Sequence, residues 1–273
     1  MPELPEVETV VQGLKRKILN KTIQKVSVYY DKIIEYPRVE EFSEKIQNQT
    51  IHDIKRYGKW IIFILDTDYL LSHLRMEGKY FIKEKNTIHN KHEHVTFLFK
   101  DNEELRYHDV RKFGKMLLIP KDKIAKIGPL KEMGKEPWDK TLTNTYLEEK
   151  LKKKTIPIKS SLLDQSIIVG IGNIYADEIL FSSNINPLKK SNTLTSKERQ
   201  AIIINTRKIL EKAIEKGGTT IRSYTSVNGV HGLFQQELSV HGKENQPCPI
   251  CKSKILKIKV AGRGTYYCPH CQK

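Results

Sequence analysis

Short runs of apolar and β-branched residues dominate the chain between about residues 23 and 119. Val26, Val28 and Tyr30 alternate with other residues, as expected for a strand with one buried face. Compact runs separated by polar breaks follow at Trp60 to Leu65, Tyr69 to Leu71, Tyr80 to Ile82, Val95 to Phe99 and Met116 to Ile119. Their length and their β-branched and aromatic content are typical of strands. The pattern therefore predicts a β-sandwich or barrel.

A helical pattern precedes these strands. Val7, Val10, Leu14 and Ile18 recur at every third or fourth position. This spacing places them on one face of a helix. We expect that face to pack against the β layer.

The pattern changes after Pro137, where the chain becomes helical. Thr195 and Glu198 have the spacing of a capping box, and Gly217 with Gly218 forms a typical helix end. Glycine, proline and charged residues mark a boundary between residues 128 and 138. The sequence thus predicts an α+β chain of three parts: an N-terminal β-sandwich domain with its leading helix (1–130), a helical domain (131–235) and a cysteine-bearing module (236–273).

The charge of the chain indicates a polyanionic partner. Its 273 residues include 48 lysines and arginines against 32 acids, a formal net charge of +16. Such an excess is typical of proteins that bind nucleic acid, although a basic surface without such a partner is the alternative. No apolar run approaches the length of a membrane span, and no secretory signal is seen at the N-terminus. We expect a cytoplasmic protein that does not bind membranes.

All four cysteines lie in the last 26 residues, as Cys248-x2-Cys251 and Cys268-x2-Cys271. Two close pairs of thiolates can surround one tetrahedral zinc ion when a hairpin brings them together. Two disulfides are the alternative, which the absence of a secretory signal disfavours. We expect one structural Zn²⁺, because four cysteine ligands leave no open coordination position.

The second residue is a candidate nucleophile. If Met1 is removed, Pro2 becomes a secondary amine at the head of the chain. Such an amine forms an iminium with a sugar aldehyde, and the iminium keeps its positive charge and acts as an electron sink. The alternative is that Pro5 and the acids around it simply start a helix.

Several segments together are similar to those of a known family. These are Pro2–Thr9, Ser72–Gly78, Asp109–Gly114, Gly170–Tyr175 and the four-cysteine hairpin, in this order. The chain resembles the bacterial formamidopyrimidine-DNA glycosylases, which excise oxidised purines and cleave the abasic site. The resemblance implies a two-lobed monomer that binds double-stranded DNA. It also implies a β-sandwich flanked by helices, a helix-two-turns-helix domain and a zinc hairpin.

The resemblance also implies catalytic roles. Pro2 would attack the sugar C1′, and Glu3 would move protons during ring opening. Lys59 would support β-elimination, and Arg263 at the hairpin tip would support δ-elimination. Lysine and arginine suit these steps because each neutralises the charge on a phosphate leaving group.

Further residues match DNA contacts of the family. Met76, Arg111 and Phe113 would fill the gap left by an extruded nucleotide, although core packing is the alternative for Met76 and Phe113. The other implied DNA contacts are His73, His92, Lys153 and Asn173. Residues 219–235, rich in serine and glycine, resemble a loop that covers the extruded base.

Two departures and two rival functions remain open. His241 stands where the family commonly has tyrosine, and an unprocessed Met1 would block Pro2. A sister class of glycosylases that prefers oxidised pyrimidines shares the N-terminal proline and the zinc hairpin. A non-catalytic zinc protein that binds nucleic acid would also explain the charge and the cysteines.

Overall fold

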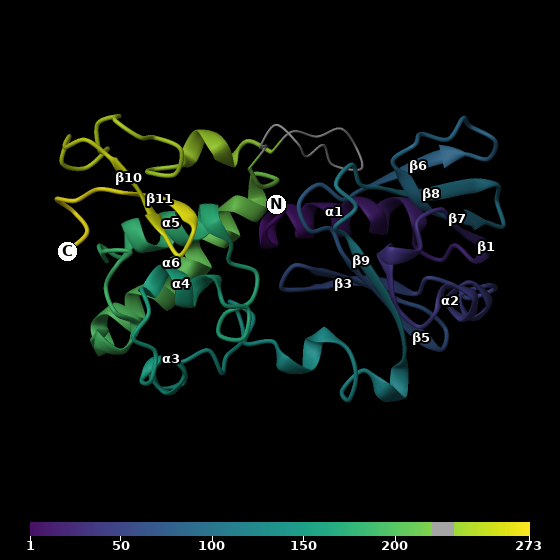
Figure 1. Cartoon of the computed structure of the whole chain (residues 1–273), viewed down its shortest axis with the longest axis horizontal. Coiled ribbons are helices and arrows are strands. Elements are labelled where there is room, and N and C mark those ends of the chain that lie inside the picture. The colour runs from purple at the N-terminus through teal and green to yellow at the C-terminus, as the bar shows by residue number, and fades with distance from the viewer. Residues whose placement is uncertain (220–231) are drawn as a thin grey trace. The chain divides into compact units, whose positions relative to one another are not determined.

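The protein, a computed structural model described over residues 1–219 and 232–273, divides into two compact units (Figure 1). The first unit consists of Met1–Lys131 and Gly217–Gly232, and the second of Glu132–Lys216 and Leu233–Lys273. Most of the loop expected over residues 219–235 falls on residues 220–231, outside the described part of the chain.

The first unit contains two β-sheets. The five-stranded sheet has the order β2 (Ile34–Tyr36), β9 (Lys115–Pro120), β5 (Asp68–His73), β4 (Trp60–Ile64) and β3 (Asp53–Tyr57). The four-stranded sheet has the order β1 (Ile23–Val28), β7 (Glu93–Phe99), β8 (Glu103–His108) and β6 (Lys79–Glu84). Neighbouring strands are antiparallel, except that β2 runs parallel to β9.

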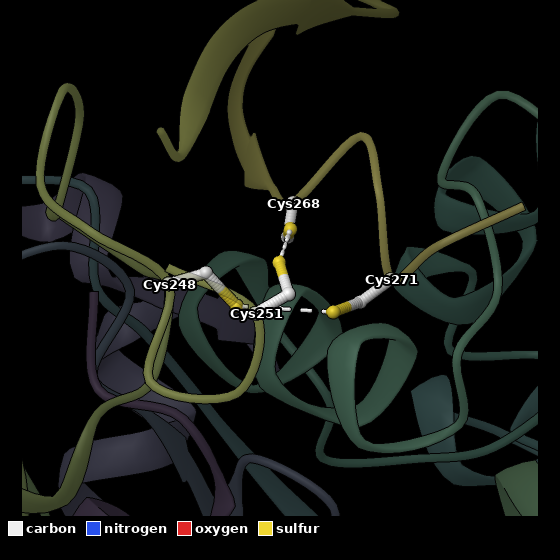
Figure 2. Close-up of side chains that lie close together, drawn as sticks. All are labelled: Cys248, Cys251, Cys268 and Cys271. Atoms are coloured by element: carbon white, nitrogen blue, oxygen red, sulfur yellow. Dashed lines mark hydrogen bonds between the residues drawn. The ribbon is translucent and has the colours of Figure 1, made fainter. Parts of the chain in front are cut away.

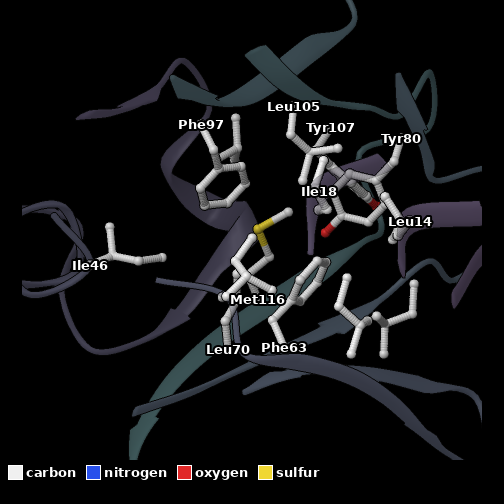
Figure 3. Packing of buried hydrophobic residues seen from close by; sticks show 14 of the residues in the cluster. Leu14, Ile18, Ile46, Phe63, Leu70, Tyr80, Phe97, Leu105, Tyr107 and Met116 are labelled. Atoms are coloured by element: carbon white, nitrogen blue, oxygen red, sulfur yellow. The ribbon is translucent and has the colours of Figure 1, made fainter. Parts of the chain in front are cut away.

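Apolar side chains of both sheets share one core (Figure 3). In β4, Ile61 and Phe63 are buried in this core, whereas Ile62 and Ile64 between and after them are half-buried. The alternation follows from the two-residue period of a strand. Members from the other strands include Leu70, Tyr80, Phe97, Leu105, Tyr107 and Met116. The predicted α+β fold with an N-terminal sandwich is confirmed.

Helix α1 (Leu4–Ile18) contributes its apolar face to the same core. Val7, Val10, Leu14 and Ile18 are all buried there, as their spacing predicts. The other helical segments of this part of the chain are η1 (Asp31–Ile33), α2 (Val39–Lys45), η2 (Lys121–Lys123) and η3 (Pro129–Glu132), whose last residue begins the second unit; η denotes a 3-10 helix.

The second unit is helical apart from one hairpin. It contains α3 (Asn144–Leu151), α4 (Ile158–Leu163), α5 (Asn173–Ser182), η4 (Ser191–Thr193), α6 (Ser196–Glu215) and η5 (Phe234–Glu237). Its strands β10 (Leu256–Val260) and β11 (Arg263–Tyr267) pair in antiparallel register. At the head of α6 the predicted capping box is present, since Thr195 N donates to Glu198 Oε2 at 2.8 Å and Glu198 N donates to Thr195 Oγ1 at 3.2 Å. Among the described residues, no helix has both the length and the apolar character needed to span a membrane.

Candidate active site and metal centre

The two residues after Met1 are buried at the head of α1, whereas Met1 itself is exposed. Pro2 is buried, and Glu3 is 2% exposed. Burial lowers the pKa of the Met1 α-amino group below its ordinary value, and the charge of Lys59 lowers it further, while the carboxylates of Glu3 and Glu6 oppose this shift. An amine in this position is therefore neutral at a lower pH than in water.

Lys59 lies in the tight turn between β3 and β4. Gly58 adopts a left-handed φ of 56° in this turn. Lys59 is 5% exposed and close enough to the Met1 amine for its charge to act there. The structure thus brings Lys59 to the same place as Pro2 and Glu3.

Glu6 connects the start of α1 to the chain beyond α6. Its Oε2 accepts from Glu3 N at 2.8 Å, and its Oε1 accepts from Thr219 N at 2.8 Å and Thr219 Oγ1 at 3.1 Å. A Cβ at Gly218 would lie 2.6 Å from Oε1, so this close approach requires glycine there. No pattern along the sequence predicts this contact, although the position of Glu6 in the first helical turn is a weak signal for a capping role.

The turn after β5 carries Met76 and is tied to His73. Arg75 N donates to His73 Nδ1 at 2.9 Å. Burial lowers the pKa of His73 to about 3, and the charges of Arg75, Lys59 and Lys115 lower it as well. His73 is therefore a neutral, buried acceptor. Met76 is half-buried in a turn and lies outside the apolar core.

The turn after β8 carries Arg111 and Phe113. Both side chains are exposed, and the Arg111 guanidinium carbon lies 4.7 Å from the centre of the Phe113 ring. A phenylalanine that is 51% exposed does not pack in the core. His92, half-buried before β7, joins this region through its backbone oxygen, which accepts from Asp109 N at 3.0 Å.

The four cysteine sulfurs lie within 4.8 Å of one another (Figure 2). Cys248 and Cys271 are 3.9 Å apart, and Cys251 and Cys268 are 3.4 Å apart, sulfur to sulfur. A tetrahedral zinc ion bound at about 2.3 Å needs sulfur separations of about 3.8 Å. The site therefore fits one Zn²⁺, and it is the only cluster of potential metal ligands found among the described residues.

Arg263 is exposed at the start of β11, directly after Gly262 with its φ of 78°. The next residue is anchored to the helices of the same unit. The Gly264 oxygen accepts from Asn173 Nδ2 at 3.0 Å and from Lys159 Nζ at 3.0 Å. Asn173 begins α5, so the structure brings this predicted residue to the hairpin that carries Arg263. Lys153 is exposed just after α3.

A buried ion pair lies beneath the hairpin. Lys159 Nζ is 2.8 Å from Asp177 Oδ1, and both side chains are fully buried. Asp177 Oδ2 lies 2.7 Å from His241 Nδ1 and accepts from Tyr266 N at 3.3 Å. The His241 imidazole is thus paired with a carboxylate. No pattern along the sequence indicates this pair.

Comparisons with known proteins match three parts of the chain. Residues 1–116 match the family described as Formamidopyrimidine-DNA glycosylase N-terminal domain, residues 133–225 its H2TH domain, and residues 245–273 the zinc finger found in FPG and IleRS. A protein from Oceanobacillus iheyensis named Formamidopyrimidine-DNA glycosylase is 48% identical over 273 residues, covering 100% of this chain and 98% of the relative.

Two solved structures are similar over the whole chain. A Lactococcus lactis FPG mutant in complex with Fapy-dG-containing DNA has a TM-score of 0.93 and 40% identity, with 100% of both chains covered. The complex between Lactococcus lactis Fpg and abasic-site DNA has a TM-score of 0.93 and 40% identity, with 99% of both chains covered. The chain belongs to the formamidopyrimidine-DNA glycosylase family.

Proposed function

We propose that this chain removes oxidised purines from duplex DNA with Pro2 as the nucleophile and then cleaves the abasic site. It is a base-excision repair enzyme with glycosylase and lyase activities, and its partner is damaged DNA. The observation that carries the proline mechanism is the burial of Pro2 beside Glu3 and Lys59, at a place where desolvation lowers the pKa of the preceding Met1 amine. We place the enzyme in the cytoplasm as a monomer.

Extrusion of the damaged nucleotide comes first. A base inside the duplex hides its glycosidic bond, so the enzyme must turn the nucleotide out at a cost of a few kcal/mol. Met76 and Phe113 are apolar side chains outside the core, suited to fill the gap. Arg111 offers hydrogen-bond donors to the base left unpaired.

Attack on the sugar follows. After removal of Met1, the neutral Pro2 nitrogen forms a bond to C1′, the glycosidic bond breaks, and the departing base takes up the proton that the nitrogen loses. Glu3 then protonates O4′ as the ring opens, and the nitrogen and C1′ become an iminium. Glu3 is buried next to Pro2, in reach of such a transfer.

Strand cleavage uses the iminium as the electron sink. Loss of the C2′ proton expels the 3′ phosphate, and a second elimination expels the 5′ phosphate. We assign Lys59 to the first step and Arg263 to the second, because each cation stabilises a departing phosphate. The exposed Arg263 suits a phosphate contact.

Further contacts position the DNA. Asn173 begins a ten-residue helix whose first N–H groups suit a phosphate, and exposed Lys153 suits another. His92 is a third such contact, whereas buried His73 acts through the backbone of Arg75. Cys248, Cys251, Cys268 and Cys271 hold the zinc ion, which supplies no chemistry and keeps the hairpin folded.

We also assign a role to each part of the chain. Residues 1–130 carry the nucleophile and the gap-filling side chains. Residues 131–235 bind the DNA backbone and include the loop that covers the extruded base. Residues 236–273 hold the zinc ion and present Arg263.

The test is borohydride trapping on a duplex with one 8-oxoguanine opposite cytosine. Processed protein should give a covalent adduct, and a variant that retains Met1 should give none. Pro2→Gly, a primary amine, should trap with altered yield. A matching duplex with an oxidised pyrimidine tests the sister activity. Tight duplex binding without any adduct from processed protein would instead indicate a non-catalytic zinc protein that binds nucleic acid.

A further inference from the structure

Two turns of the first unit carry the proposed gap-filling side chains, and we refer to residues 74–78 and 109–114 as the wedge loops. Each loop contains a non-glycine residue in the left-handed region, Arg75 with a φ of 52° and Lys112 with a φ of 57°. Such residues rarely adopt this conformation unless the surrounding contacts enforce it. The contacts that enforce it here are buried beneath the loops.

Asp109 organises the second wedge loop. Its side chain is fully buried, and its two oxygens accept hydrogen bonds from three backbone N–H groups of the loop. The donors are Arg111 N at 3.0 Å, Phe113 N at 2.9 Å and Gly114 N at 2.8 Å. One carboxylate thus fixes the backbone on both sides of the exposed Arg111 and Phe113 side chains.

Tyr107 contacts both wedge loops at once. Its buried hydroxyl donates to Asp109 Oδ2 at 3.4 Å, and burial together with the Asp109 charge raises its pKa, so it remains a donor. A Cβ at Gly114 would lie 1.6 Å from this hydroxyl oxygen, and a Cβ at Gly78 would lie 2.3 Å from it. Each loop therefore approaches the same oxygen so closely that only glycine fits.

We infer that Tyr107 and Asp109 are positioning residues that hold the two wedge loops in one fixed arrangement. Met76, Arg111 and Phe113 then enter the duplex as a preorganised set. Neither Tyr107 nor Asp109 touches DNA, because both are buried. Preorganisation removes the entropy that would otherwise be lost when separate loops become ordered on insertion. This inference rests on the proposed gap-filling roles.

Hydrogen exchange of the free protein tests the coupling without reference to activity. Tyr107→Phe removes only the shared hydroxyl, and it should increase amide exchange in both wedge loops. Tyr80→Phe is the matched control, since Tyr80 is also fully buried but donates its hydroxyl to Ser72 Oγ at 2.7 Å. Faster exchange in residues 109–114 alone, or equal effects of the two variants, would overturn the coupling.

Single-turnover kinetics test the consequence for repair. Asp109→Asn should slow 8-oxoguanine excision from a duplex by about tenfold or more, as expected when a buried charged acceptor is lost. Cleavage of an abasic site in single-stranded DNA should change less than threefold, because no gap in a duplex needs filling. Equal losses on both substrates would show a merely structural role and overturn the inference. If wild-type protein cleaves neither substrate, the proposed function fails, and the exchange experiment still decides the coupling.

Discussion

The sandwich of the first unit and the cysteine hairpin of the second hold their strands in place by different means. In the sandwich, one apolar cluster extends from Val7 in α1 to Leu118 in β9. At the hairpin, the corresponding cluster contains Phe181, Val240 and Ile255 with two of the cysteines. The hairpin therefore buries little apolar surface of its own.

Polar interactions replace the missing apolar core at the hairpin. Four sulfurs converge on one point, and Lys159 donates to Thr265 Oγ1 at 2.8 Å and to the Gly264 oxygen at 3.0 Å. Modules of this size usually need a metal or crosslinks, because they cannot bury enough surface. Stability in the sandwich is spread over many side chains, whereas in the hairpin it depends on a few.

The largest effect should come from removing a zinc ligand. Cys268→Ser should abolish stoichiometric zinc binding and unfold the hairpin, because structural zinc contributes on the order of 10 kcal/mol to such modules. Metal analysis and hydrogen exchange of residues 245–273 measure this, with β7 as the internal control. Full zinc content with unchanged hydrogen exchange would contradict the claim that the hairpin depends on its zinc ligands.

The second largest loss of stability should come from replacing the buried Lys159. Lys159→Met leaves the Asp177 carboxylate buried without the cation that faces it at 2.8 Å, which typically costs about 3–5 kcal/mol. The double variant Lys159→Met, Asp177→Leu should recover only part of this loss, because it removes the unpaired carboxylate but also takes away the oxygen that His241 Nδ1 and Tyr266 N contact. Denaturant unfolding, monitored by hydrogen exchange of the β11 amides, measures the stability of both variants. If Lys159→Met is as stable as wild type, the buried ion pair does not stabilise this region.

The elements that depend on periodicity could be predicted from the sequence. The apolar runs predicted strands, the spacing from Val7 to Ile18 predicted the helical face, and the cysteine spacing predicted the zinc site. These signals are local, because residues a few positions apart share one face or one ligand set.

Contacts between distant polar residues could not be predicted. Lys159 and Thr265 are 106 positions apart, and Glu6 and Thr219 are 213 positions apart. No period links such residues, so the sequence gives no signal for their pairing. The burial of His73 was missed for a related reason, since the end of a strand can be exposed or covered depending on which side chains pack there.

Acid should destabilise the first unit through His73, and His108, whose pKa burial also lowers, should add to this effect. Burial lowers the pKa of His73 to about 3, so below pH ~6.5 the unfolded chain takes up a proton that the folded chain excludes. The stabilisation is complete above pH ~6.5 and declines toward pH 3, with a loss of about 2 kcal/mol between pH 7 and pH 5.

Comparison with His73→Gln isolates this contribution. Denaturant unfolding of the first unit at pH 7 and pH 5 should show a smaller pH dependence in the variant than in wild type. His52→Asn is the control, because His52 is half-exposed at the surface beside Asp66. If His52→Asn flattens the profile and His73→Gln leaves it unchanged, the assignment to His73 is wrong.

The smallest effect should come from trimming one methyl group in the sandwich core. Ile61 is fully buried among many apolar neighbours, so Ile61→Val should cost about 0.5–1.5 kcal/mol. Ile62→Val, at the half-buried next position of β4, is the matched control and should cost less. Both variants should retain full zinc content. Because the core is shared by two sheets and a helix, the neighbours of Ile61 compensate for one methyl group, whereas no neighbour can replace a missing sulfur ligand. A loss at Ile61 as large as that at Cys268 would refute this difference between the two regions.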